Sequence, residues 1–296
     1  MGGHLDGRTT RGPVTSAPAV DGAMTRPWVD FSTVDKSADP DAHARYLEGM
    51  ALRMATLRAR SLAQLPLAPG AAFLDAGCGL GEVVIDVARR VAPGGRAVGV
   101  DLSHEMLRRA RESAAATGSD VQFVHGSVTA LPFDADAFDV ASSERVFQHL
   151  TDDERRTAAG ELLRVVRPGG AIQVSDPNHE QWALSAADRG AAQAVCSWIA
   201  RRGRSAESGL LAGALLRDAG AVKVDIEVSP VVIRTLTDWF QMLGMEGAID
   251  ELVEQGELTE ARARDFFEDL VERDRDGVFL VAGLTYVTTA QAPAAP

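Results

Sequence analysis

Residues 73–82, Phe-Leu-Asp-Ala-Gly-Cys-Gly-Leu-Gly-Glu, combine a short apolar run, a carboxylate and three closely spaced glycines. This order predicts a strand that carries Asp75 near its end, then a glycine turn, then a helix. Because Gly77, Gly79 and Gly81 carry no side chain, the backbone can approach a ligand closely. The free N–H groups at the start of the helix point toward the same turn, so we expect a nucleotide-like cofactor there.

The turn differs from the dinucleotide fingerprint G-x-G-x-x-G, in which the third glycine comes three residues after the second. With Gly79 as the second glycine, the third would stand at position 82, which is Glu82. A carboxylate that faces the turn repels a pyrophosphate and suits a cofactor without phosphates that carries cationic groups. An NAD-dependent oxidoreductase is therefore disfavoured.

A second acidic residue follows at the expected distance. Residues 95–101 predict a strand, and Asp101 at its end lies twenty positions after Gly81. This is near the distance at which an acid meets ribose hydroxyls in a βαβ unit. Ser103 then predicts the N-cap of the next helix, with Met106 one turn further on.

Further ordered motifs follow these residues. They are a strand at 121–126 with the run Ser-Val-Thr-Ala-Leu-Pro-Phe at 127–133, a strand at 138–143 with Glu-Arg-Val-Phe-Gln-His-Leu at 144–150, a helix end at 162–170, and a strand at 171–176. Over residues 71–177 the chain resembles the class I S-adenosylmethionine (SAM) dependent methyltransferases, and its glycine turn resembles their motif I. The resembling branch acts on quinones, sugars and natural products.

The resemblance implies roles for individual residues. Asp75 and the glycine turn would hold the methionine end of SAM, and Met106 would pack on the adenine. Where the family usually has an aspartate that bonds the adenine amino group, this chain has Ser127, so the Ser127 hydroxyl or the Val128 backbone N–H would serve instead. The predicted cofactor-binding residues are Asp75, Gly77, Cys78, Gly79, Asp101, Leu102, Met106, Ser127, Val128 and Glu144.

Two histidines are candidate catalytic residues. Methyl transfer from a sulfonium is an in-line displacement in which positioning supplies much of the acceleration, and a base is needed only where the acceptor must lose a proton. His149 follows the fourth strand, on the side where the transferable methyl should lie, although a histidine there can equally support the backbone or the cofactor. His179, after the fifth strand, is a second candidate base.

The predicted substrate-binding residues gather near the same edge of the sheet. Arg145 suits a carboxylate or another substrate anion, and Asp176 would orient an acceptor hydroxyl or amine. Trp182 suits an aromatic wall. For each residue of the set, ordinary packing is the alternative. The set is Tyr46, Arg145, Gln148, Asp176, Trp182 and Trp239.

Bulk properties narrow the class of protein. The 296 residues carry a net charge of −12, which repels a phosphate backbone and disfavours a nucleic-acid substrate. Two cysteines give no disulfide framework or C-x-x-C metal site, and no D-D or D-N pair follows the fifth strand, so a metal-independent reaction is favoured. Without an eighteen-residue apolar run or a signal segment, we expect no membrane partner and a cytoplasmic location.

The repeated alternation of strands and helices predicts an α/β fold. By the resemblance, this is a Rossmann-like, seven-stranded, mostly parallel sheet with helices on both faces and a small helical cap over the site. The late strand at 278–287 would lie antiparallel beside the fifth strand. The predicted organisation is a disordered tail (1–25), an N-terminal helical lid (26–66), a SAM-binding domain (67–290) with a cap insertion at about 230–276, and a frayed tail (291–296).

The sequence thus predicts a methyltransferase that converts SAM to S-adenosylhomocysteine. Its acceptor would be a hydroxyl, amine or nucleophilic carbon of a small hydrophobic molecule, with a role in secondary metabolism. The first alternative is a non-methylating reaction of the same fold, such as a cyclisation or decarboxylation. An NAD-dependent oxidoreductase and a non-enzymatic SAM-binding protein are weaker alternatives, and a homo-oligomer is left open.

Overall fold

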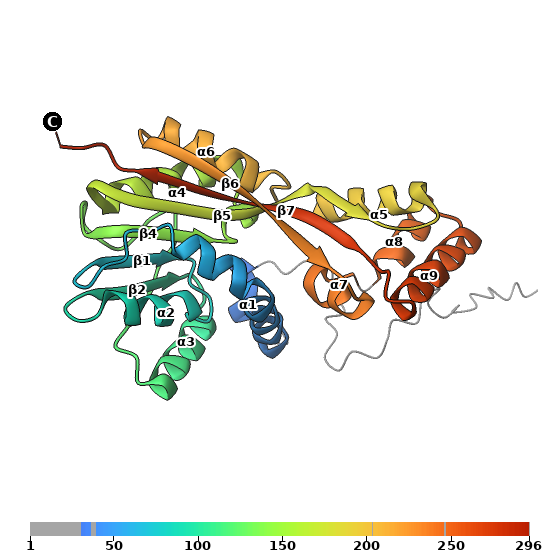
Figure 1. The fold of residues 1–296 in the computed structure, drawn as a ribbon, viewed down its shortest axis with the longest axis horizontal. Helices are drawn as coiled ribbons and strands as arrows, with labels where there is room; N and C mark the ends of the chain where they lie inside the picture. Colours follow the sequence, from blue (N-terminus) through green and yellow to red (C-terminus); the bar gives the residue numbers. More distant parts are fainter. Residues whose placement is uncertain (1–30, 37–39, 203, 246, 296) are drawn as a thin grey trace, which may run out of the picture.

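The computed structural model describes residues 31–36, 40–202, 204–245 and 247–295 (Figure 1). The predicted tail at 1–25 and the lid residue Trp28 lie outside this part of the chain. None of the helices in the described part combines the length and apolarity that crossing a bilayer requires.

Within the described residues, seven strands form one sheet in the order β3-β2-β1-β4-β5-β7-β6. The first five are parallel to their neighbours, whereas β7 is antiparallel to both β5 and β6. The strands are β1 (Ala72–Ala76), β2 (Arg96–Asp101), β3 (Gln122–His125), β4 (Phe138–Glu144), β5 (Val166–Leu184), β6 (Val222–Ile233) and β7 (Val281–Gln291). The predicted Rossmann-like sheet and its antiparallel late strand are confirmed.

Helices cover both faces of this sheet, as predicted for parallel strands. One layer consists of α2 (Glu82–Val91) and α3 (His104–Thr117), and the other of α4 (Asp152–Val165) and α6 (Ser208–Asp218). Adjacent strand residues point to opposite faces. Phe73 of β1 therefore packs with Val84 of α2, whereas Leu74 packs with Leu162 of α4.

Local signals in the sequence set where the helices begin. The Ser103 hydroxyl accepts a hydrogen bond from the backbone N–H of Met106 at 3.1 Å, which confirms it as the N-cap of α3. Thr259 caps α9 (Glu260–Arg275) in the same way. Thr151 and Glu154 form a reciprocal capping box at the start of α4.

The described chain begins with two helices and ends with a long strand. The predicted helix at 40–65 is α1 (Pro40–Leu62), preceded by the short 3-10 helix η1 (Phe31–Lys36). The predicted frayed tail is wrong at its start, because β7 continues to Gln291 and Ala292 donates a backbone hydrogen bond to Gly170 at 2.9 Å.

The helical cap contains more of the chain than predicted. Its core joins α5 (Arg189–Arg202), α7 (Leu236–Leu243), α8 (Ala248–Glu254) and α9. Helix α5 comes from a segment that carried no prediction. Helices α7 and α8 are separate, because Gly244 and Gly247 between them adopt left-handed φ angles of 56° and 74°.

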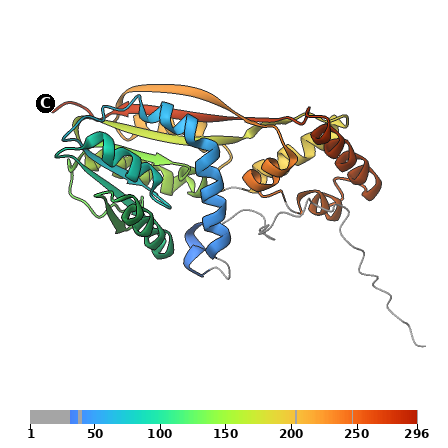
Figure 2. The same ribbon diagram turned by 60° about the horizontal axis from the view of Figure 1, so that its bottom comes forward.

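The cap does not lie where the sequence analysis placed it. Strands β5, β6 and β7 extend beyond the rest of the sheet, and the cap packs at their far end (Figures 1 and 2). It does lie beside α1, as expected. Arg53 of α1 forms an ion pair with Asp238 at 2.6 Å, and the Tyr46 hydroxyl donates to the carbonyl of Met242 at 3.3 Å.

Candidate active site

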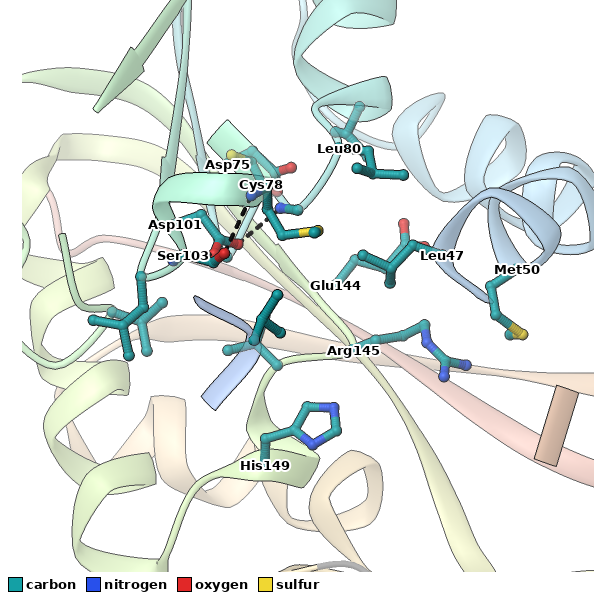
Figure 3. A pocket seen from close by; sticks show the side chains of 18 of the residues that line it. Leu47, Met50, Asp75, Cys78, Leu80, Asp101, Ser103, Glu144, Arg145 and His149 are labelled. Carbon is teal, nitrogen blue, oxygen red and sulfur yellow. Dashed lines mark hydrogen bonds between the residues drawn. The ribbon is translucent and has the colours of Figure 1, made fainter. Parts of the chain in front are cut away.

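A cavity of about 240 Å³ opens at the carboxyl ends of β1, β2 and β4, with α1 along one side (Figure 3). Ligands of open α/β sheets bind at this edge. All ten predicted cofactor-binding residues line it, together with Glu82. The wall of the cavity therefore brings together residues from 75 to 144 that the sequence separates.

The three glycines of the turn serve different purposes. A Cβ on Gly77 would lie 2.3 Å from Val146, and one on Gly81 would lie 2.5 Å from Phe123. These two positions require glycine because of the protein's own packing, rather than because of a ligand. At Gly79 the nearest neighbour of a Cβ is Leu47 at 3.6 Å, and φ is +50°. Only Gly79 leaves room for a ligand.

Asp75 is a buried carboxylate at the floor of the cavity. Its Oδ1 accepts a hydrogen bond from the Ser142 hydroxyl at 2.8 Å. Burial raises the pKa of Asp75 to about 7, and the neighbouring carboxylates of Glu144 and Asp101 act in the same direction. A cationic group in the cavity would stabilise the ionised form.

Glu144 and Arg58 form a bidentate pair beside Asp75. The Arg58 guanidinium donates to the two carboxylate oxygens at 2.8 and 3.0 Å, and both side chains are mostly shielded from solvent. Burial opposes the charge on Arg58, but the hydrogen bonds and charge of Glu144 raise its pKa. The pair offers acceptor and donor atoms at one place, as the ammonium and carboxylate of an amino acid require.

Asp101 is oriented by the turn that it faces. One of its oxygens accepts from the Gly79 N–H at 2.8 Å, and the other accepts from the Ser103 N–H at 2.9 Å. Burial raises its pKa, although these hydrogen bonds favour the ionised form. Carboxylate oxygens still have lone pairs for a ribose diol, so the role predicted for Asp101 is sterically and chemically open.

An apolar slot lies beyond Asp101. Leu102 is 48% exposed on one side, whereas Met106 is 1% exposed on the other. The Ser127 hydroxyl hydrogen-bonds the Thr129 hydroxyl at 2.7 Å and accepts from the Thr129 N–H at 3.2 Å. Much of the capacity of Ser127 is therefore used within its own turn, which leaves the Val128 backbone as the simpler donor or acceptor for an adenine edge.

The N-terminal segment closes this slot. Val34 of η1 lines the cavity and packs with Met106. Asp35 accepts from the Ser103 hydroxyl at 2.5 Å and from the backbone N–H groups of His104 and Glu105. Weak burial opposes the charge of Asp35, but these hydrogen bonds lower its pKa. The predicted lid is thus fastened to the N-terminus of α3, where a negative charge is favoured.

The donor set fits SAM. Its ammonium needs buried acceptors, its carboxylate needs a cation, its ribose needs an acid, and its adenine needs an apolar slot. The cavity wall supplies Asp75, Arg58 with Glu144, Asp101, and the Leu102–Met106 slot for these four groups. No group of three or more candidate metal ligands is found among the described residues.

Three predicted catalytic or substrate residues also line the cavity: His149, Arg145 and Tyr46. His149 lies on the 3-10 turn η2 (Phe147–His149), just after β4. The Arg145 guanidinium donates to the Tyr46 hydroxyl at 3.0 Å. The prediction that these side chains meet near the cofactor turn is therefore supported by their positions.

Five other predicted residues lie outside the cavity, and their roles as direct ligands or base are corrected here. They are 0–8% exposed, and hydrogen bonds or aromatic contacts within the protein account for their positions. These residues are Gln148, Asp176, His179, Trp182 and Trp239. Trp239, for example, packs at an edge against Phe240 in the cap core.

Four of the five form a connected network below η2. Asp176 accepts from the backbone N–H groups of Phe147 and Gln148 at 3.3 and 3.0 Å. The Gln148 amide oxygen is 2.8 Å from His179 Nε2, and Trp182 Nε1 donates to His179 Nδ1 at 3.1 Å. These residues support the turn that carries His149 rather than contacting a substrate.

Sequence reasoning identified Tyr46 of α1 but missed three further residues of this helix: Met50, Met54 and Arg58. Tyr46, Met50, Met54 and Arg58 recur every four residues and all line the cavity. Residues four apart lie on one face of a helix. Met50 and Met54 are buried, and they also form part of the cavity wall. The helical spacing was the signal that would have identified Arg58.

Comparisons with known proteins agree with this geometry. Residues 73–170 match the methyltransferase domain family. The chain is 29% identical to an uncharacterized 37.1 kDa protein in a transposon of Streptomyces fradiae, over 88% of this chain and 74% of that protein. It is 40% identical to the demethylmenaquinone methyltransferase of Thermus thermophilus, over 34% of this chain and 45% of that enzyme.

Two solved structures share the fold. The phosphoethanolamine N-methyltransferase 2 of Haemonchus contortus, in complex with SAM, superposes with a TM-score of 0.55 at 17% identity, over 90% of this chain and 60% of that one. The [4+2]-cyclase SpnF superposes with a TM-score of 0.51 at 23% identity, over 81% of each chain. Residues 73–170 therefore match a methyltransferase domain, and the chain shares the fold of SAM-dependent methyltransferases.

Proposed function

We propose that this protein transfers the methyl group of SAM to a hydroxyl, amine or nucleophilic carbon of a small hydrophobic acceptor, without a metal. The observation that carries the proposal is that Asp75, Asp101 and the Arg58–Glu144 pair line one cavity that continues to His149 and Arg145. The similarity to a demethylmenaquinone methyltransferase supports a small-molecule acceptor. A secondary-metabolite role and a cytoplasmic location stay predictions from the sequence.

The chain's contribution to the reaction is mainly positioning. Bound SAM supplies an electrophilic methyl group on its sulfonium. Asp75 and the Arg58–Glu144 pair would hold the amino-acid end, and Asp101 would hold the ribose. With η1 fastened over the slot by Asp35, the methyl group would face the part of the cavity lined by Tyr46, Arg145 and His149.

His149 is our candidate for the residue that receives a proton from the acceptor. Its place on η2 is fixed from below by the network around Asp176 and Gln148. His149→Gln should lower turnover while leaving the affinity for SAM unchanged, because glutamine keeps the size and hydrogen bonding but does not take up a proton at neutral pH. Unchanged turnover would rule out the base role.

The function itself is tested in two steps. Calorimetric titration of the full chain with SAM, S-adenosylhomocysteine and NAD should give binding of the first two and none of NAD. Incubation with SAM labelled in its methyl group and fractionated small-molecule extracts should then transfer label to a product. Binding of NAD in preference to SAM would overturn the proposal.

A second candidate is a non-methylating reaction in the same cavity. It is favoured by the shared fold of SpnF, which is described as a [4+2]-cyclase. An intact SAM site is compatible with such a reaction. The labelling experiment separates the two, because a cyclase consumes its substrate without label appearing in the product.

A further inference from the structure

Arg145 has a backbone conformation that is unusual for its type. It is the first residue after β4, and its φ is +60°. This left-handed region is disfavoured for a side chain with a Cβ, and such residues cluster at functional sites. The Arg145 N–H donates to the carbonyl of Ser175 at 2.8 Å, and its own carbonyl accepts from Gln148 Nε2 at 3.0 Å. Hydrogen bonds therefore hold both the backbone N–H and the backbone carbonyl of Arg145.

A buried chain of hydrogen bonds continues from that carbonyl. Trp182 Nε1 can only donate, so His179 Nδ1 is the acceptor and His179 Nε2 carries the proton that it donates to Gln148. Burial lowers the pKa of His179 to about 3, so the ring stays neutral over the ordinary pH range. The side-chain network has one arrangement, and that arrangement keeps Arg145 in its left-handed conformation.

The held backbone directs the guanidinium into the cavity (Figure 3). Its only hydrogen bond to another described side chain is the one to the Tyr46 hydroxyl at 3.0 Å, and no described carboxylate lies within ion-pair distance. Arg58, in contrast, is bonded through two nitrogens to Glu144. A guanidinium has five N–H donors, so most of those of Arg145 remain for a ligand.

The two arginines serve different parts of the cavity. The charges that act on Arg58 are those of Glu144, Glu82 and Asp75, all beside the glycine turn. The charge of Arg145 acts on Asp176 and His179 of β5 instead. The carboxylate of the methyl donor therefore has its cation in Arg58. Arg145 lies on the side of His149, where an acceptor would bind.

We propose that Arg145 is the anion-binding residue of the acceptor site, so that the acceptor is a small molecule with an apolar body and a carboxylate. The inference rests on the proposed function, because it places the acceptor beside a bound methyl donor. Planar guanidinium groups bind carboxylates through two parallel hydrogen bonds. Tyr46 and Met50 of α1 provide apolar surface on the same side of the cavity.

The test compares acids with their uncharged analogues. The full chain, with and without S-adenosylhomocysteine, is titrated calorimetrically with 4-hydroxybenzoate, cinnamate and indole-3-acetate, and with the primary amide of each. We expect at least one acid to bind tenfold or more tightly than its amide. Arg145→Gln should abolish this preference and leave the affinity for S-adenosylhomocysteine within threefold.

Two further variants make the result specific. Arg145→Gly suits the left-handed backbone, so it keeps the fold and should lose the preference as well. Arg156→Gln removes an exposed charge of α4 and should change nothing. His179→Phe, which breaks the buried chain, should reduce the preference for acids without changing the affinity for S-adenosylhomocysteine.

Three outcomes would overturn the inference. They are no acid that binds more tightly than its amide, a preference that survives in both Arg145 variants, and a loss of S-adenosylhomocysteine affinity in those variants, which would assign Arg145 to the methyl donor. If the wild-type chain binds no S-adenosylhomocysteine, the proposed function fails instead. The titrations without that ligand still decide whether Arg145 selects anions.

Discussion

Two buried aspartates on different strands of the sheet differ in what surrounds them. Asp75 in β1 and Asp176 in β5 are both almost fully buried, and burial raises the pKa of each to about 7. Asp176 has three donors from the protein, namely two backbone N–H groups and the Ser208 hydroxyl. Asp75 has one side-chain donor, and it faces a cavity.

The difference separates a carboxylate that is bonded within the protein from one that is open to a ligand in the cavity. Burying a charge is costly unless hydrogen bonds or an opposite charge compensate for it. Around Asp176 the protein supplies three hydrogen-bond donors, which offset part of the cost of burial, whereas around Asp75 most of the compensation must come from a cationic ligand. The sequence suggested a ligand role for both aspartates because each follows an apolar run that predicts a strand. That position is therefore not enough, by itself, to predict contact with a ligand.

The largest effect should come from removing the charge of Asp75. Asp75→Asn should weaken binding of S-adenosylhomocysteine more than a hundredfold, because breaking a buried charged pair costs about 3 kcal/mol. The free energy of unfolding of the ligand-free protein at pH 8 should rise, because burial raises the pKa of Asp75 and the ionised carboxylate lacks full compensation until a ligand binds. Calorimetric titration and urea denaturation measure the two quantities. Wild-type affinity in this variant would contradict the assignment.

The matched change in the other aspartate should have the opposite pattern. In Asp176→Asn the side-chain N–H₂ group would face one of the two backbone N–H groups. Because both groups are donors, that hydrogen bond is lost, and the free energy of unfolding should fall by about 2 kcal/mol. The affinity for S-adenosylhomocysteine should stay within threefold. Urea denaturation monitored by circular dichroism checks the first value. Equal stability with lost affinity would show that Asp176 contacts the ligand after all.

The pH dependence of binding should reflect Asp75. Its pKa of about 7 in the ligand-free protein means that the carboxyl is largely protonated at pH 6 and ionised at pH 8. Because the ammonium of the ligand pairs with the ionised form, affinity for S-adenosylhomocysteine should fall about tenfold from pH 8 to pH 6. Asp75→Asn should flatten the profile. If the affinity of the wild-type protein did not change between pH 6 and pH 8, the pKa of Asp75 would lie outside this range.

The smallest effect should come from weakening the hydrogen bonds by which Asp35 holds the N-terminal segment against α3. Asp35→Asn weakens a charged cap on α3, which is worth about 1 kcal/mol, so S-adenosylhomocysteine should dissociate about fivefold faster. Stopped-flow displacement measures this rate. Asp120→Asn, an exposed carboxylate beyond the end of α3, is the control and should leave the rate unchanged.

The cofactor half of the site could be predicted because it is local in the sequence. Glycine turns, acids at strand ends and N-caps depend on a few consecutive residues, so Asp75, Gly79, Asp101 and Ser103 were found by spacing alone. The two other glycines were found for a partly wrong reason, since protein packing explains Gly77 and Gly81.

The acceptor half could not be predicted in the same way. Whether His179 or Asp176 reaches a cavity depends on how far β5 extends and on which helices cover its end. The cap was expected over the site, but the extension of β5, β6 and β7 carries it away, and Trp239 packs into its core. Arg58 was missed because its partner Glu144 is 86 residues away.

The sequence by itself determined the class of protein, the alternation of strands and helices, and a set of residues that all line one cavity, because the motifs that carry them depend on short-range spacing and on strand or helix periodicity. Only the tertiary structure decided which buried polar side chains are satisfied by the protein and which still face a cavity. That distinction rests on long-range packing, which sets Asp75 and Arg145 apart from Asp176 and His179.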